Sequence, residues 1–471
     1  MGQTSRLTVG LVAAVAIWGL AAAGGWASHA PLLSPEPPAR DTAEIVVTED
    51  KPGPNEVEIS RESDEAQPVR LRTCELDDTL VSAADGELYL SVRTLDGQPL
   101  LSRAGDQTVA PASVVKLFTA VAAMRTLGPD FRFTTRVIAG DQPGEIWLVG
   151  GGDVTLTRSP QSNYYDSDAS VESLATQAVQ ALAEEGLAPT GFSVDATRYE
   201  QFPQWNDSWR AGAARLGFVA PVTALQVDAD RDQPAVRLSP RSGEPTVRAS
   251  MWFGDALDRA AGTRVDYLGT GVAPDGSVIA AVSSAPLTEL LRIMLVDSDN
   301  SLAEVIAREV ALAQGMSDPG AAVLDAAGLP DRLLEDVVLV DGSGLSDDTQ
   351  ISQDAVTWLL ADIAASDALD AVRDGLAIAG ETGSLRNRYE TTAGALAGRV
   401  AAKTGSLTGI RSLAGYIEAD DGSEMVFSVV VAGPRVDNSS RADIDLLVAD
   451  LARCGENLAD WNSTDRDDSL G

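Results

Sequence analysis

The chain has 471 residues, of which 44% are apolar, so it is long enough to bury one large core or a few smaller ones. Its 70 acidic residues outnumber its 35 basic residues, and the formal net charge is −35. Such a charge repels nucleic acids and anionic membrane surfaces, which argues against a nucleic-acid-binding role.

Histidine and lysine are almost absent. The only histidine is His29, at the edge of an N-terminal apolar segment, so the rest of the chain offers no Ser-His-Asp triad and no histidine-ligated zinc site. We therefore expect no metal and no cofactor. The only lysines are Lys51, Lys116 and Lys403, in a chain that otherwise uses arginine. They are either chance survivors or positions that need a side chain able to lose its proton.

The N-terminus is typical of an export signal. Residues 7–27 are apolar or small apart from Thr8, and they follow Arg6. We expect residues 1–30 to be a signal peptide, cleaved near Ala23 or Ala27, or a membrane anchor of about 20 residues. Both alternatives put the rest of the chain outside the cytoplasm, in the cell envelope. Residues 31–70 are rich in Pro, Glu, Asp and Ser, which predicts a disordered linker.

The first predicted elements are strands at 87–92 and near 99–103, joined by an Asp-Gly turn. A helix is expected to open at Pro111 and to end near Gly128. From 131 to 284 the pattern changes to short strands and turns, with one amphipathic helix near 171–185.

After Pro286 the pattern is helical again, over 290–296 and 302–313. Strands follow at 398–404, 412–418 and 425–431, and a last amphipathic helix covers 441–453. Strands at both ends of the chain, with helices between them, predict an α+β fold whose sheet is built from both ends.

Two short motifs can carry nucleophilic chemistry. Ser113 and Lys116 have the spacing S-x-x-K at a predicted helix start, which puts both side chains on one face. A serine hydroxyl needs a proton acceptor to attack, and a neutral lysine can supply it, aided by the positive end of the helix dipole. Ser298-Asp299-Asn300 lies at the break between two helices, where it could relay a proton or simply cap the second helix.

A third motif, Lys403-Thr404-Gly405-Ser406, ends a predicted strand. A strand edge can pair with an extended peptide, and Gly405 would let a substrate approach the backbone closely. Taken alone, the motif is equally compatible with a solvated strand end.

Together, S-x-x-K, S-D-N and K-T-G occur in the order found in penicillin-binding proteins and class A β-lactamases. With its long gap between Lys116 and Ser298, the chain resembles the class C low-molecular-mass penicillin-binding proteins, which are D-alanyl-D-alanine carboxypeptidases and endopeptidases. The resemblance covers about residues 75–455 and extends to the strings at 148–153, 219–225, 341–346 and 380–388. Val154, where proline is usual, and Ser406, where threonine is frequent, depart from the family pattern.

The resemblance implies a penicillin-binding-protein/β-lactamase-like transpeptidase domain, an antiparallel sheet flanked by helices, with a large inserted domain. The expected division is a catalytic domain in two parts (71–130 and 285–455), an inserted domain (131–284) that supplies no motif residue, and an acidic tail (456–471).

It also implies the role of each motif residue. Ser113 is the acylated nucleophile and Lys116 its proton acceptor, while Ser298 passes a proton to the leaving D-alanine. Asn300 holds Lys116 and the substrate amide. Lys403 attracts the terminal carboxylate of the substrate, as do the hydroxyls of Thr404 and Ser406, which flank Gly405. The N–H groups of Ser113 and Ser406 form the oxyanion hole.

The implied activity is cleavage of peptidoglycan stem peptides that end in D-Ala-D-Ala, with β-lactams as acylating inhibitors. Two alternatives are a β-lactamase, which needs an activated water that no motif supplies here, and a non-catalytic cell-wall-binding scaffold. Because the first strands and the last helix of this fold pack on one sheet, we expect a disulfide between Cys74 and Cys454, the only cysteines. The alternative is two unpaired thiols.

Overall fold

The computed structural model describes residues 74–76, 86–160, 164–389 and 396–458. Contacts divide the chain into residues 1–67 and 68–471, and every described residue belongs to the second unit. The predicted export segment, the linker and nearly all of the acidic tail therefore lie outside the described residues. Within the described ranges, no helix is both long and apolar enough to cross a membrane.

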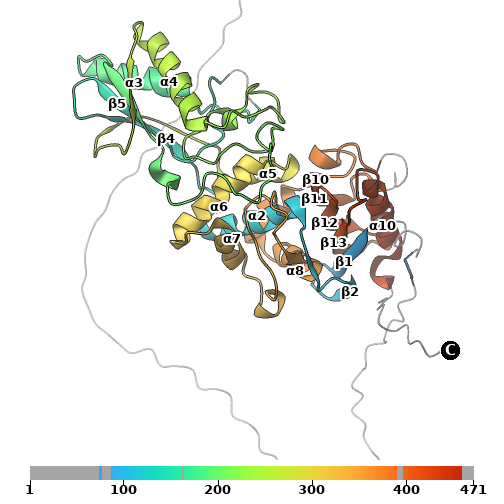
Figure 1. Ribbon diagram of the computed structural model, residues 1–471. Coiled ribbons are helices and arrows are strands. Elements are labelled where there is room, and N and C mark those ends of the chain that lie inside the picture. Colours follow the sequence, from blue (N-terminus) through green and yellow to red (C-terminus); the bar gives the residue numbers. More distant parts are fainter. Residues whose placement is uncertain (1–73, 77–85, 161–163, 390–395, 459–471) are drawn as a thin grey trace, which may run out of the picture. The chain divides into compact units, whose positions relative to one another are not determined.

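A six-stranded antiparallel sheet combines both ends of the chain (Figure 1). Its order is β10-β11-β12-β13-β1-β2, and the first and last long strands pair in register, with Leu90 opposite Val429. The strands are β1 (Glu87–Thr94), β2 (Pro99–Arg103), β10 (Ala377–Ile378), β11 (Val400–Leu407), β12 (Ile410–Glu418) and β13 (Glu424–Ala432). The predicted α+β class and its central sheet are confirmed.

Helices cover both faces of this sheet. Successive residues of a strand point to opposite faces, so Leu413 packs on one side with α10 (Ser440–Cys454) and Ala414 on the other with the remaining helices. Those helices are α2 (Val115–Thr126), α5 (Leu287–Val296), α6 (Asn300–Gln314), α7 (Pro319–Ala327), α8 (Gln353–Ala364) and α9 (Asp370–Asp374). A separate two-stranded sheet pairs β3 (Thr108–Val109) with β9 (Ile351–Ser352).

A second sheet is formed only by residues 134–283. Its order is β7-β6-β5-β4-β8, and one face packs on two helices through a separate apolar core. Its elements are β4 (Thr134–Ala139), β5 (Glu145–Val149), α3 (Val171–Glu184), β6 (Gly191–Asp195), α4 (Pro245–Ala261), β7 (Asp266–Thr270) and β8 (Val278–Ser283). The sequence predicted α3 but missed α4, although Pro245 in its first turn and Gly262 after its end are ordinary helix boundary signals.

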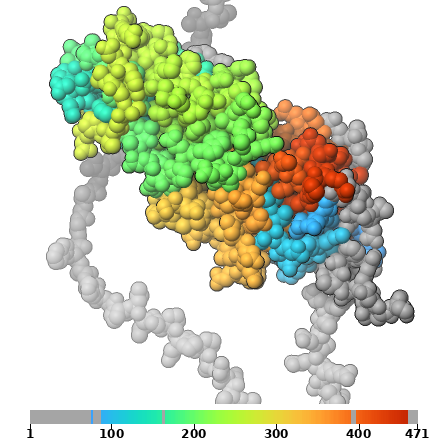
Figure 2. All heavy atoms as spheres, viewed as in Figure 1, coloured from blue at the N-terminus to red at the C-terminus, as the bar shows by residue number. Residues whose placement is uncertain are grey.

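Another part of the middle segment (residues 131–284) packs on the helical layer instead. Tyr199, Phe202, Trp209 and Val219 are buried in the same core as α2 and α6. In Figure 2 the green atoms of this part lie directly against the yellow and orange atoms of the helices. The expected division into an inserted domain over 131–284 and a catalytic domain in two parts stays a prediction.

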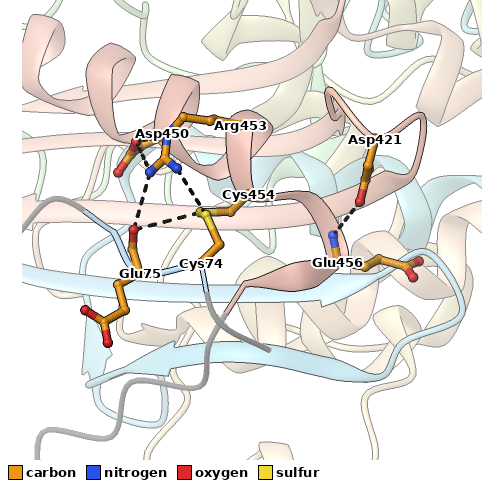
Figure 3. Close-up of a disulfide and its surroundings, with 7 residues drawn as sticks. All are labelled: Cys74, Glu75, Asp421, Asp450, Arg453, Cys454 and Glu456. Atoms are coloured by element: carbon orange, nitrogen blue, oxygen red, sulfur yellow. Dashed lines mark hydrogen bonds and ion pairs between the residues drawn. A yellow bond between two sulfur atoms is a disulfide. The ribbon is translucent and has the colours of Figure 1, made fainter. Parts of the chain in front are cut away.

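The structure contains the predicted disulfide between Cys74 and Cys454, whose Cα atoms are 5.5 Å apart (Figure 3). Beside it, the Arg453 guanidinium pairs with Asp450 at 2.6 Å and donates to the Glu75 carbonyl at 3.3 Å. The bridge joins the end of α10 to the residues that precede β1, so it ties together two segments that are 380 residues apart in the sequence.

Candidate active site

Ser113 lies in a short 3-10 turn, Ala112–Val114, that leads directly into α2. One turn later the Lys116 side chain is fully buried, and its Nζ has three oxygen neighbours. They are Ser113 Oγ at 3.0 Å, Asn300 Oδ1 at 2.7 Å and the Ser343 carbonyl at 2.6 Å. The lysine therefore connects the first two motifs and is aimed at the candidate nucleophile.

Burial makes the charged form of Lys116 costly. It lowers the pKa of this lysine to about 8, although the acidic side chains of Asp341, Glu304 and Asp299 act in the opposite direction. A pKa near 8 leaves a substantial neutral fraction at physiological pH, so Lys116 can accept a proton from Ser113.

The S-D-N motif occupies the break between α5 and α6, as predicted. Asp299 is the N-cap of α6, and its Oδ1 accepts a hydrogen bond from the Leu302 N–H at 3.0 Å. Neither Ser298 nor Asn300 is the cap, so both side chains are free to meet the lysines. Asn300 also donates from Nδ2 to the Phe218 carbonyl at 3.0 Å, which links the motif to the middle segment.

The K-T-G motif lies on β11, which continues through it to Leu407, three residues beyond the predicted end. Lys403 is fully buried, and its Nζ donates to Ser298 Oγ at 2.9 Å and to the Thr404 carbonyl at 3.0 Å. Burial, followed by the charges of Lys116 and Arg237, holds the pKa of Lys403 well below its usual value. A nearby anionic group would act in the opposite direction and favour the charged form of Lys403.

The remaining residues of this motif have distinct environments. Thr404 Oγ1 donates to Ser384 Oγ at 2.8 Å, while the Ser406 side chain is exposed. At Gly405 a Cβ atom would lie 2.1 Å from Ser412 Oγ and 2.6 Å from the Pro111 carbonyl. The structure thus requires glycine here to let β11 approach the turn that carries Ser113, a reason different from the substrate access expected from the sequence.

Ser113, Ser298, Asn300, Thr404 and Ser406 line one cleft of about 950 Å³. Ser384 and Leu345 also line the cleft, and they belong to the strings at 380–388 and 341–346 that carry the family resemblance without an expected role. The middle segment also contributes lining residues, including Arg210, Phe218 and Arg237. The middle segment therefore forms part of the cleft wall, although it holds none of the three motifs.

Asp341 organises the loop that supplies the third oxygen neighbour of Lys116. Its Oδ1 accepts from the N–H groups of Ser343 at 3.2 Å and Gly344 at 2.6 Å. Its Oδ2 accepts from the Ser346 N–H at 2.9 Å and from Trp209 Nε1 at 2.8 Å. Four donors on one buried carboxylate hold the Ser343 carbonyl in place against Lys116.

The site combines a half-buried serine and a fully buried lysine at a helix start, a serine and an asparagine at the junction of α5 and α6, and a lysine on β11. This combination defines a class of enzymes. It is the class of penicillin-recognising serine hydrolases, in which a serine next to a lysine is acylated.

The model of the D-Ala-D-Ala carboxypeptidase 3 (S13) family matches residues 83–251 and 235–453, and the chain belongs to this family. It is 38% identical over 376 residues to Carboxypeptidase DacB of Mycolicibacterium smegmatis, an alignment that covers 76% of this chain and 78% of the relative. It is 28% identical over 434 residues to D-alanyl-D-alanine carboxypeptidase of Actinomadura sp. (strain R39), covering 76% and 79%. The crystal structure of penicillin binding protein 4 (dacB) from Haemophilus influenzae has the same fold, with a TM-score of 0.65 and 19% identity over 79% of this chain and 98% of that one.

Proposed function

We propose that the chain is a serine-type D-alanyl-D-alanine carboxypeptidase that acts on peptidoglycan stem peptides through an acyl-enzyme at Ser113. The observation that carries this proposal is the buried Lys116 Nζ, 3.0 Å from Ser113 Oγ, with its pKa lowered to about 8. Membership of the S13 family supports both the reaction and the substrate class.

In the first step, neutral Lys116 takes the hydroxyl proton of Ser113 as Oγ attacks the carbonyl carbon of the penultimate D-alanine. The N–H groups of Ser113 and Ser406 receive the developing oxyanion, and each donor of this kind stabilises a transition state by about 3 kcal/mol. When the intermediate collapses, the bond to the amine of the terminal D-alanine breaks and the acyl-enzyme remains.

The leaving amine needs a proton as that bond breaks. Ser298 is the proposed donor, because its Oγ lies 2.9 Å from Lys403 Nζ and faces the same cleft as Ser113. Lys116 then passes the proton that it took from Ser113 to Ser298, which restores both groups. Water attacks the ester carbonyl, Lys116 accepts one of its protons and returns it to Ser113 Oγ, and the shortened stem is released. Asn300, 2.7 Å from Lys116 Nζ, keeps the lysine oriented through both half-reactions.

The terminal carboxylate of the substrate is proposed to bind beside Lys403, Thr404 and Ser406. Since the pKa of Lys403 is held far below its usual value by burial and by Lys116, the incoming carboxylate favours proton uptake by Lys403. Substrate binding and protonation of this lysine are thus coupled. The same chemistry releases a cross-linked neighbouring stem when its amine is the leaving group, so endopeptidase activity is a second proposed reaction.

We further propose that the protein works outside the cytoplasm. The disulfide between Cys74 and Cys454 supports this, because such bridges persist in oxidising compartments. Cleavage or anchoring of residues 1–30 rests on the apolar N-terminal sequence alone.

A fluorescent penicillin separates the proposal from its alternatives. A carboxypeptidase gives a burst of one covalent label per chain followed by slow release, and it removes D-alanine from a stem pentapeptide. A β-lactamase releases hydrolysed drug rapidly without stable label, and a non-catalytic scaffold gives no label. Either of the last two results, or a label that survives Ser113→Ala, contradicts the proposed function. Comparing the pentapeptide with a cross-linked stem dimer distinguishes the two peptidase reactions.

A further inference from the structure

Arg231 is a fully buried guanidinium that reaches from the middle segment to the S-D-N motif. Its Nη2 pairs with Asp299 Oδ2 at 3.0 Å, and both side chains are almost completely shielded from solvent. The guanidinium carbon also lies over the rings of Tyr164 and Tyr165, 4.3 Å and 4.6 Å from their centroids. Nη1 donates to the Asp228 carbonyl at 3.2 Å, so the group is held both by the two rings and by hydrogen bonds at its edge.

The motif that it contacts is strained. Ser298 has a φ of 58°, in the left-handed region that a residue with a side chain rarely adopts. Such a conformation persists only when the surrounding structure enforces it, and it concentrates at functional sites. The positions of the two residues on either side of Ser298 therefore decide where its hydroxyl points.

Both neighbours of Ser298 are held by the middle segment. Asp297 accepts a hydrogen bond from Tyr164 OH at 2.9 Å, and its carbonyl accepts from Arg237 Nη1 at 3.1 Å. Asp299 accepts from Tyr165 OH at 3.1 Å in addition to its ion pair with the buried guanidinium. Since the other oxygen of Asp299 caps α6, its carboxylate is fixed at both ends and cannot rotate.

We propose that Arg231 is a positioning residue for the acylation of Ser113. By holding Asp299, it aims Ser298 Oγ at Lys403 and Asn300 Oδ1 at Lys116. This inference rests on the proposed function of Ser298 and Asn300, and it assigns to the middle segment a part in the reaction that the motifs alone do not indicate.

The charge state of Asp299 agrees with this geometry. Burial opposes its ionisation, but Arg231 and the Leu302 N–H outweigh that effect, and the pKa of Asp299 lies below its ordinary value. Without the guanidinium, this buried carboxylate would lose its ion pair and keep the Leu302 N–H and the Tyr165 hydroxyl as hydrogen-bond donors. A lysine at 231 would restore the charge, but its compact ammonium has no planar face to lie over the two tyrosine rings and cannot span the positions that the guanidinium nitrogens reach.

The chain offers a matched control on the same helix. Arg198, also from the middle segment, donates from Nε and Nη2 to the two carboxylate oxygens of Glu309 in α6, at 2.8 Å and 2.6 Å. This second ion pair joins the same two parts of the molecule but lies far along α6 from the S-D-N motif. Arg198→Met therefore reports the effect of a lost ion pair without a displaced motif.

The test uses the full chain with Arg231→Met, Arg231→Lys and Arg198→Met. Progress curves with a fluorescent penicillin separate the initial non-covalent affinity from the rate constant of acylation, and thermal unfolding measures stability. Displacement of a reacting group by about 1 Å can cost about 100-fold in rate, so Arg231→Met is expected to lower the acylation rate constant by about 100-fold. The non-covalent affinity should change little. Arg231→Lys should fold and remain slow, and Arg198→Met should lose stability while acylating at the wild-type rate.

Three results overturn the inference: wild-type acylation in Arg231→Met, wild-type acylation in Arg231→Lys, or an equal loss of acylation in Arg198→Met. If Arg231→Met does not fold, the acylation rate constant of Arg231→Lys alone tests the inference. A failure of the proposed function is distinct from all of these, because the wild-type protein itself would then carry no Ser113-dependent label.

Discussion

Replacement of Lys116 by arginine tests the central claim about the mechanism. The substitution keeps a positive charge at a position where the native pKa is about 8. At pH 7 such a lysine is neutral in about one molecule in ten, whereas an arginine is neutral in fewer than about one in 10⁵. The ratio predicts that acylation falls by about 10⁴-fold, the upper end of what a general base contributes.

The assay is the second-order rate constant for labelling by a fluorescent penicillin, followed from pH 6 to pH 9. In the wild-type protein the rate should rise about tenfold per pH unit below pH 8 and level off above it, because protonated Lys116 cannot accept the proton. Wild-type labelling by Lys116→Arg, or a rate that does not change between pH 6 and pH 8, would refute the neutral-lysine mechanism.

Three further changes have defined outcomes. Ser113→Ala should abolish β-lactam labelling and D-alanine release at an unchanged unfolding temperature, and any remaining covalent label would identify another nucleophile. Lys403→Arg should be milder than Lys116→Arg in acylation and should mainly weaken binding of the substrate carboxylate; equal damage would mean that the two lysines do not divide the roles as proposed. Replacing Cys74 and Cys454 by serine should lower the free energy of unfolding by about 2–5 kcal/mol, measured by urea denaturation, and should leave acylation intact. Two reactive thiols per chain in the denatured, unreduced wild-type protein would contradict the bridge.

The local sequence correctly predicted the helices and strands whose hydrophobic pattern and boundary residues indicate the same element. The strands at 87–92 and 425–431 and the helix at 171–185 were predicted within a few residues, because alternation and helical periodicity are properties of the segment itself. The order of the three motifs and the rarity of lysine also predicted which residues meet in the site. Helix α4 was missed, although the proline in its first turn and the glycine after its end could have indicated it.

The residue that caps α6 and the reason for glycine at position 405 could be identified only from the tertiary structure. From the sequence, Ser298 or Asn300 was the expected helix cap and Gly405 was expected to admit substrate. In the folded chain, Asp299 is the cap and Gly405 lets β11 pass close to Pro111. These outcomes depend on distances between segments that are far apart in the sequence, and no periodicity within one segment reports such distances.

The residue types at 113, 116, 298, 300 and 403 were enough to indicate the class of chemistry, because they have few other uses in that order. The proposed protonation chemistry and the contribution of the middle segment could be inferred only from the folded chain. The pKa of Lys116 depends on complete burial, and the hold on Asp299 depends on Arg231, which is 68 residues away in the sequence. Burial and ion pairing are properties of the packed chain, and they arise only when distant segments exclude water from the same place.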